Sequence, residues 1–324
     1  MAVKIGFVGC GGIANAHMKN LAKIDSAEMV AFSDIAEEKA EKAAEEYGGT
    51  SFGGDYAAMY EKADLDAVYV CLPPFAHEDQ ELLAADAGLA LFVEKPIALS
   101  MDKAREIEAA IDDAGVINCS AYHWRTHDTI KWAMEALADD TIGLVLGWWM
   151  GGLPGVMWWR QQDMSGGQIL EQTTHIIDTA RYIAGDVDRV SAEMALRVMT
   201  DVEKISVPDV GVVNLRFESG AVGNITNSCI PPGWRNGLCI VGEKKTVVFD
   251  QFNFELRTPS GTETMNWQPI AAHFRESVLF VDAVEQDDQS LILSDYSNGV
   301  KSLAVSIAAN ESAASSEPVM LSDV

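Results

Sequence analysis

The sequence predicts an α/β protein in which an N-terminal, doubly wound parallel sheet precedes an α+β domain with a large, mostly antiparallel open sheet. Strand and helix patterns alternate over the first 121 residues, which is the rhythm of parallel strands with crossover helices. A glycine-rich turn joins the first apolar strand to the first helix. Beyond residue 121, apolar runs mostly follow one another directly, as antiparallel strands do. We therefore expect two domains, residues 1–121 and 122–324.

In the first domain, short apolar runs alternate with amphipathic segments. The expected strands are residues 3–8, 28–33, 67–72, 90–94 and 116–120. The expected helices are residues 12–24, 36–47, 55–62, 76–87 and 101–114. Gly48, Gly88 and Gly115 stand where three of these helices should stop, because glycine adopts the left-handed conformation that ends many helices.

The second domain is expected to begin with a helix near residues 127–138 and a strand that runs into Trp148. After a loop and a helix that carries residues 171–178, the expected strands are 190–199, 210–218, 221–229, 237–241, 246–249 and 253–257. Helices near 270–285 and 293–313 and a short strand at 318–321 close the chain.

Composition narrows the class of protein. A chain of 324 residues with 48 % hydrophobic residues can fill two cores. The net charge of −26, from 49 acidic and 23 basic residues, argues against nucleic acid or an anionic membrane as a partner. This acidity fits both ordinary solubility and adaptation to high salt.

With no apolar run of 18 residues and no leader before the first strand, we expect a cytoplasmic protein. Five scattered cysteines without a C-x-x-C pair predict neither disulfides nor a zinc site.

The turn after the first strand carries the dinucleotide fingerprint G-x-G-x-x-A, formed by Gly9, Gly11 and Ala14, with Gly12 and Ile13 between them. Gly9 allows the tight turn, Gly11 lets a pyrophosphate approach the backbone, and Ala14 lets helix and strand pack closely. The amino end of the following helix offers N–H groups to the phosphates. This pattern predicts a Rossmann domain.

Asp34 ends the second strand, 25 residues after Gly9. An acidic residue there suits the two ribose hydroxyls of NAD and repels the 2′-phosphate of NADP. No arginine occurs before Arg105, so NAD is expected rather than NADP. The alternative for Asp34 alone is a turn residue that caps the next helix.

Two further motifs carry reactive groups. Glu171, Thr174, His175 and Asp178 lie three and four residues apart, which places them on one face of a helix. A buried histidine with capping carboxylates is the structural alternative. Glu171 and His175 also have the spacing of two metal ligands, but no third ligand is evident, so we predict no metal. Lys95 follows a charged Glu94 at the end of an apolar strand, where this fold opens onto its ligand crevice; a surface lysine is the alternative.

Taken together, these motifs resemble the Gfo/Idh/MocA family of glucose–fructose oxidoreductase and inositol dehydrogenase-like enzymes. The resemblance covers nearly the whole chain and rests on Gly9-x-Gly11-Gly12-Ile13-Ala14-x-x-His17, Glu94-Lys95-Pro96, Trp124-Arg125, Trp159-Arg160 and Gly166-Gly167…Glu171-x-x-x-His175-x-x-Asp178. It implies that Lys95 is the catalytic lysine, that a cis peptide bond precedes Pro96, and that His175 is the general acid/base. It also implies oligomer contacts, as a dimer or tetramer, through the open sheet of the second domain.

The resemblance further implies two sets of contacts. Besides the glycine turn and Asp34, the cofactor set is Pro73, His77, Glu94, Lys95, Arg125, Trp159 and Arg160. The substrate set is Lys95, Trp124, Glu171 and His175, and Glu171 joins Lys95 and His175 in the catalytic group. Capping remains an alternative for His77, and packing for each tryptophan. The usual Asp-x-Gly-x-His appears here as Glu171-Gln-Thr173-Thr-His175, so the polar geometry around the substrate differs and direct contact by Glu171 stays open.

The chemistry also follows from the residues. Oxidation of a secondary alcohol needs a hydride acceptor, which a nicotinamide supplies, and a base for the hydroxyl proton. A histidine with an ordinary pKa of about 6.5 can act as that base, and a lysine can stabilise the developing alkoxide. Asp178 can orient the imidazole, cap a helix or lie at the surface. The sequence thus predicts an NAD-dependent oxidoreductase acting on a sugar, cyclitol or related polyol. The alternative is a non-redox lyase, hydrolase or dinucleotide-sensing regulator on the same scaffold; the presence of both Lys95 and His175 favours chemistry over sensing.

Overall fold

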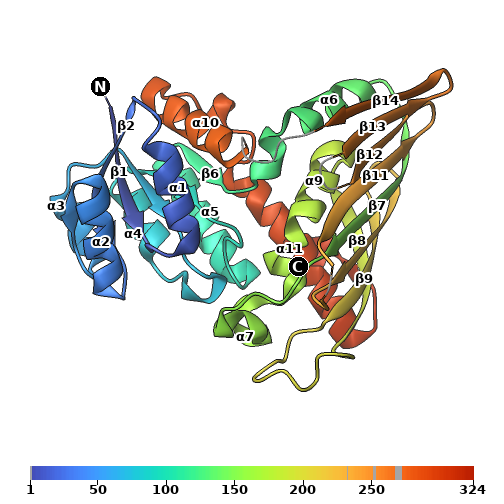
Figure 1. Cartoon of the computed structure of the whole chain (residues 1–324), viewed down its shortest axis with the longest axis horizontal. Helices are drawn as coiled ribbons and strands as arrows, with labels where there is room; N and C mark the ends of the chain where they lie inside the picture. Colours follow the sequence, from blue (N-terminus) through green and yellow to red (C-terminus); the bar gives the residue numbers. More distant parts are fainter. Residues whose placement is uncertain (1, 232, 251–252, 267–271) are drawn as a thin grey trace. The chain divides into compact units, whose positions relative to one another are not determined.

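The computed structural model describes residues 2–231, 233–250, 253–266 and 272–324. The chain divides into two compact units, Met1–Thr126 with Ile270–Val300, and His127–Pro269 with Lys301–Val324. Figure 1 shows the sheet of each unit. Among the described residues, no helix combines the length and the apolar character needed to cross a membrane.

This division differs from the expected one, because part of the C-terminal segment belongs with the first unit. Helix α10 (Ala272–Gln286) packs against helix α1 (Gly12–Leu21). Its Phe280 and Val281 are fully buried in the core of the first unit. The boundary expected at residue 121 lies five residues later, at Thr126, and the second boundary falls within helix α11 (Tyr296–Ser315).

The first unit contains a six-stranded parallel sheet in the order β3-β2-β1-β4-β5-β6. The strands are β1 (Val3–Val8), β2 (Ala27–Ser33), β3 (Thr50–Ser51), β4 (Ala67–Val70), β5 (Ala90–Val93) and β6 (Asn118–Ser120). This is the strand order of the doubly wound dinucleotide-binding fold, so the predicted class is confirmed. Strand β3 was not predicted, since two residues form no readable pattern.

The helices of this unit follow the predicted ones closely, apart from α1 and α4, which are shorter. With α1 and α10 they are α2 (Glu37–Tyr47), α3 (Tyr56–Lys62), α4 (Gln80–Asp86), α5 (Met101–Ala114) and the 3₁₀ helices η1 (Pro74–Ala76), η2 (His123–Thr126) and η5 (Gln289–Leu291). Gly48 and Gly115 end α2 and α5 with positive φ angles of 82° and 65°. The side chains of Asp55 and Ser100 cap α3 and α5.

Aromatic rings hold the middle of the first sheet. Tyr69 on β4 stacks on Phe92 of β5 at 4.2 Å and on Phe7 of β1 at 5.0 Å. Phe280 of α10 stands edge-on to Tyr69 and Phe92, at 5.4 Å from each. These rings are fully buried, and they fix the three strands whose carboxyl ends carry the glycine turn, Cys71 and Glu94.

The second unit contains a nine-stranded sheet in the order β14-β13-β12-β11-β7-β10-β9-β8-β15. Strands β7 and β10 run parallel, and the other described pairs run antiparallel. The strands are β7 (Ile142–Met150), β8 (Val187–Ala195), β9 (Val210–Phe217), β10 (Val222–Ser228), β11 (Arg235–Gly242), β12 (Thr246–Asp250), β13 (Asn253–Thr258), β14 (Gly261–Asn266) and β15 (Val319–Met320). The polar strand β14 was not predicted.

Helix α9 (Thr174–Ala184) covers one face of this sheet (Figure 1). Burial alternates along strands such as β7 and β9. A Cβ built on Gly147 of β7 would lie 2.5 Å from Cγ2 of Ile176, so glycine lets α9 lie close. The other helices here are α6 (Asp128–Leu137), α7 (Gln162–Ser165), α8 (Gln168–Glu171) and the 3₁₀ helices η3 (Met157–Arg160) and η6 (Leu321–Asp323).

Candidate active site

The glycine turn lies between the carboxyl end of β1 and the start of α1. Gly9 has a φ of 84°, and a Cβ built on it would lie 2.5 Å from the carbonyl oxygen of Cys71, so this position requires glycine. A Cβ on Gly11 or Gly12 would meet no protein atom within 4 Å. Ala14 is fully buried, as expected. The open backbone at the amino end of α1 therefore fits the pyrophosphate of a dinucleotide.

Asp34 follows β2 and hydrogen-bonds back to the glycine turn. Its two carboxylate oxygens accept hydrogen bonds from the N–H groups of Cys10, at 2.7 Å, and Ala36, at 2.8 Å. Asp34 therefore supports the glycine turn, but it is not the N-cap residue of α2, which is Ala36. A carboxylate has about four lone-pair sites, so each oxygen keeps capacity for a ribose hydroxyl. The neighbouring Ile35 is 96 % exposed, and Ile13 at the start of α1 is also exposed.

At the end of β5, Glu94 anchors the backbone of Lys95. Its buried carboxylate accepts hydrogen bonds from Nε2 of His17 at 2.8 Å and from the N–H of Lys95 at 2.9 Å. Burial by itself would raise the pKa of Glu94, but the hydrogen bond and charge of His17 and the charge of Lys95 hold it below its ordinary value. The geometry thus supports a positioning role for Glu94. Lys95 is partly exposed, and the Lys95–Pro96 peptide bond is cis, as the resemblance implied.

His77 lies after β4 in a turn that follows η1, with Pro73 on the other side of η1. The expected helix begins at Gln80 rather than at residue 76, because the Gln80 side chain bonds back to Ala76 and closes the turn. His77 therefore ends η1 and does not cap α4, whose N-cap residue is Asp79. Its buried imidazole pairs through Nδ1 with the buried carboxylate of Glu81.

Trp124 and Arg125 lie on the short helix η2, which is tied to the C-terminal part of the first unit. The buried Arg125 guanidinium donates from Nη1 to the carbonyl of Leu293 at 2.8 Å. Thr126 Oγ1 donates to the carbonyl of Ala272 at 2.9 Å. Trp124 is partly buried. These contacts give Arg125 a structural partner, and its contact with a cofactor remains a prediction.

Glu171 and His175 lie on two helices instead of the one that was expected. Helix α8 ends at Glu171 and α9 begins at Thr174, while Gln172 between them has φ −120° and ψ −50°. The N–H of Thr173 bonds to the carbonyl of Gln168, five residues back, so the regular ladder is broken. The shared face therefore holds for Thr174, His175 and Asp178, which all lie on α9, but not for Glu171. Glu171 and His175 are both buried, 8 % and 5 % exposed.

His175 lies against Trp149, which points inward from β7. The two rings stack at 5.9 Å with an angle of 26°. Side-chain amides form a network around the segment that precedes His175. Gln168 Nε2 donates to Gln172 Oε1 at 3.0 Å, and Asn227 Nδ2 donates to Gln168 Oε1 at 2.8 Å. This network links α8 to β10 and fixes the segment that precedes His175.

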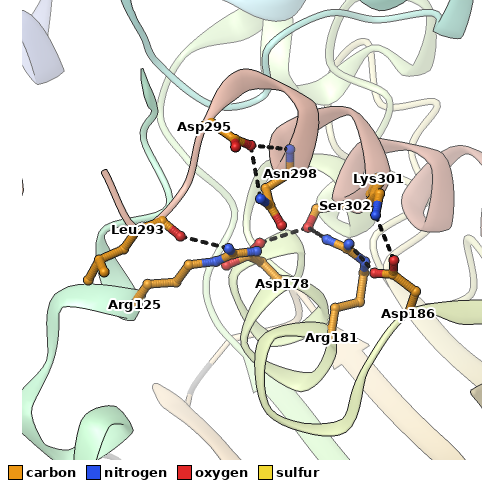
Figure 2. A network of polar contacts seen from close by, with 9 residues as sticks. All are labelled: Arg125, Asp178, Arg181, Asp186, Leu293, Asp295, Asn298, Lys301 and Ser302. Atoms are coloured by element: carbon orange, nitrogen blue, oxygen red, sulfur yellow. Dashed lines mark hydrogen bonds and ion pairs between the residues drawn. The ribbon is translucent and has the colours of Figure 1, made fainter. Parts of the chain in front are cut away.

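Asp178 joins the histidine helix to α11 (Figure 2). The hydroxyl of Ser302 donates to Asp178 Oδ1 at 2.7 Å and accepts from Arg181 Nη1 at 2.7 Å. Arg181 also pairs with Asp186, which Lys301 approaches at 2.7 Å. Asp178 is fully buried and lies within α9. Of the three roles considered for it, capping and surface exposure are therefore wrong.

Trp159 and Arg160 lie on the 3₁₀ helix η3. Trp159 is 2 % exposed and packs with Val207 and Cys229 in a small core. Packing, the alternative for each tryptophan, accounts for this ring. Arg160 Nη1 donates to the carbonyl of Glu203 at 3.4 Å.

Sequence reasoning did not single out several residues of these sites. Trp234 stands against Trp149, and His273 stacks on His123 at 3.7 Å in the first unit. Their partners lie far away in the chain, so no local pattern marks them. Trp149 lies on the buried face of β7, along which burial alternates.

Two family models match the chain. Residues 3–123 match the oxidoreductase family with an NAD-binding Rossmann fold, and residues 133–248 match the GFO/IDH/MocA C-terminal domain. The chain belongs to the Gfo/Idh/MocA family. This membership confirms the predicted family, the oxidoreductase class and the NAD-binding Rossmann domain.

The similarity of this Gfo/Idh/MocA protein to individual relatives agrees with the family assignment. The myo-inositol 2-dehydrogenase of Thermotoga maritima is 32 % identical over 237 residues, which cover 70 % of this chain and 68 % of the relative. The crystal structure of a probable dehydrogenase from Thermotoga maritima has a TM-score of 0.85 at 26 % identity, over 99 % of this chain and 100 % of that chain. A levoglucosan dehydrogenase in complex with NADH has a TM-score of 0.89 at 20 % identity, over 99 % of both chains, and shows the same fold.

Proposed function

We propose that this protein oxidises a secondary alcohol of a sugar, cyclitol or related polyol with NAD, and that Lys95 and His175 serve this one reaction. The observation that carries the proposal is that both side chains have dedicated supports. Glu94 anchors the backbone of Lys95 and bonds to His17 on α1, the helix that follows the glycine turn, and Trp149 backs His175. The names of the relatives, which refer to myo-inositol and levoglucosan, support a polyhydroxy substrate.

The residues divide the work of one oxidation. Bound NAD would supply the acceptor for the hydride of the carbinol carbon. The neutral imidazole of His175 accepts the proton of the hydroxyl, and the Lys95 ammonium stabilises negative charge on the same oxygen. Glu171 and Trp124 supply further substrate contacts. The remaining predicted cofactor contacts are Gly11, Gly12, Ile13, Asp34, Pro73, His77, Arg125 and Arg160.

The direct test is a panel of sugars, inositols and linear polyols with NAD or NADP, read as absorbance of the reduced nicotinamide. We expect reduction of NAD by at least one cyclic or linear polyol. A protein that binds NAD but reduces none of it across the panel would support the non-redox alternative.

The cofactor preference depends on Asp34. We expect NAD to bind at least roughly tenfold more tightly than NADP, a difference of about 1.4 kcal/mol, because the carboxylate repels a 2′-phosphate. Asp34→Ser combined with Ile35→Arg should shift the preference toward NADP. Calorimetric affinities that are equal for the two cofactors in the wild type would remove this role of Asp34.

The outer face of the nine-stranded sheet supports a homo-oligomer. Leu146, Val212 and Val222 point outward from three neighbouring strands and are 37–52 % exposed. Exposed apolar groups on adjacent strands are typical of an interface. Sedimentation should give a dimer or tetramer, and Val222→Asp should reduce its size.

Five free thiols, four of them buried, support a reducing compartment such as the cytoplasm.

A further inference from the structure

A pair of tryptophans extends from His175 toward solvent in the second unit. Trp149 stacks on the imidazole at 5.9 Å and is 6 % exposed. Trp234 stands against Trp149 at 5.5 Å, with the ring planes at 77°. Trp234 is 57 % exposed, so much of this residue is accessible to solvent. The two rings therefore form a nearly right-angled aromatic corner beside the proposed base.

The chain holds Trp234 in this place through its neighbour Arg235. Arg235 is the first residue of β11 and pairs with Asp250 through two hydrogen bonds, of 3.0 and 2.6 Å. Its guanidinium also lies 5.6 Å from the ring of Trp148, on the outer face of the sheet. Trp234 directly precedes this anchored residue and contacts Trp149, which lies on the buried face of β7.

We propose that Trp234 determines specificity by stacking on the C–H face of a ring-shaped polyol whose reacting hydroxyl lies at His175. This inference rests on the proposed function and deepens it by naming cyclic polyols as the substrate class. A pyranose or cyclitol presents a compact face of C–H groups, and an aromatic ring offers a large, rigid apolar surface at low entropic cost. An open-chain polyol presents no such face and must lose internal rotations to bind.

Burial shows which ring does the stacking. Trp149 is enclosed and already occupied by His175, whereas Trp234 exposes an aromatic surface that the fold does not need to bury. An exposed tryptophan held by a neighbouring ion pair is a preformed platform. Trp234 therefore makes the protein selective for ring-shaped substrates, and this role is separate from the chemistry at Lys95 and His175.

The test compares Trp234→Phe with Trp234→Leu in the full-length protein. Phenylalanine keeps an aromatic face, and leucine keeps apolar volume without one. The probes are myo-inositol and D-sorbitol, which carry the same numbers of carbons and hydroxyls, together with levoglucosan and xylitol. We expect kcat/KM for the cyclic probes to fall about tenfold or more in Trp234→Leu, mainly through KM, while the values for the linear probes change less than twofold. Trp234→Phe should retain most of the cyclic preference.

A binding measurement separates this inference from the proposed function. Saturation-transfer NMR with the NADH-loaded protein should show saturation of the ring C–H protons of a cyclic probe, and this signal should be lost in Trp234→Leu. Equal losses for cyclic and linear probes, or unchanged saturation in Trp234→Leu, would overturn the stacking role. Saturation that depends on Trp234 without any reduction of NAD would leave the platform in place and refute the dehydrogenase.

Discussion

At the scale of single residues, the structure separates glycines that the fold requires from glycines that leave space. Gly9 combines a positive φ with a close approach to Cys71, whereas Gly11 has an ordinary φ of −78° and an open side. Both were predicted from one motif. The motif alone could not show which glycine is strained and which leaves open space. That difference depends on how closely Cys71, the residue after strand β4, approaches each glycine.

This difference predicts opposite phenotypes for two similar substitutions. Gly9→Ala should lower the stability of the unliganded protein by about 1–3 kcal/mol, because the new Cβ clashes with backbone in a strained conformation. Gly11→Ala should leave that stability nearly unchanged and weaken NAD binding. Thermal unfolding without ligand and NAD titration would measure both. Equal destabilisation by the two changes would contradict the assignment.

Local motifs predict Lys95 and His175 as site residues. Their supports were not predicted, because the supporting contacts join distant parts of the chain. His17 and Glu94 are 77 residues apart, and Ser302 lies 124 residues after Asp178. A single sequence holds no signal for such pairs. Only the fold brings them together.

At the scale of elements, the break between α8 and α9 shows that a residue spacing typical of one helix can extend over two helices. The spacing from Glu171 to His175 matches a helix, yet Gln172 leaves the helical region. Gly166 and Gly167, with φ angles of 68° and 80°, confine α8 to four residues. Helix α5 has the predicted bounds, because it is longer and has a side-chain cap from Ser100 at its start and Gly115 at its end.

The link between α9 and α11 gives a prediction at this scale. Ser302→Ala should lower the free energy of unfolding by about 1–3 kcal/mol, because it removes a buried hydroxyl that serves both Asp178 and Arg181. It should also lower kcat, since α9 carries His175. The matched control is Ser306→Ala: that hydroxyl is buried too, but it donates only to the carbonyl of Ser302 in its own helix. Similar losses for both variants would show that the link between the helices is unimportant.

At the scale of the whole molecule, the order of elements was predictable and the division into units was not. Alternating strands and helices indicate a parallel sheet, and its observed order follows the expected fold. Helix α10 returns to the first unit because Phe280 completes the aromatic core there. Nothing in the sequence of α10 says which of two apolar cores it joins.

The first unit should lose stability in mild acid. Burial lowers the pKa of His273, and nearby His17 and Lys95 add to this effect while Glu94 opposes it. A lowered histidine pKa favours the neutral form in the folded state, so stability is full above about pH 6.5 and falls as the pH drops toward the folded-state pKa. Glu94, also lowered, loses its contribution at still lower pH. His273→Phe keeps a ring against His123 and should flatten the decline just below pH 6.5 in denaturant titrations; an unchanged pH dependence would argue against His273.

The central claim is that Lys95 and His175 act on one oxygen in an NAD-dependent oxidation. The most direct measurement is the kcat for NAD reduction by His175→Ala, Lys95→Ala and the double variant with the best polyol of the panel, alongside calorimetric NAD affinity. We expect each single variant to lose roughly 10²-fold or more in kcat with little change in NAD affinity, and the double variant to lose less than the product of the two. Near-normal kcat in either single variant would contradict the claim.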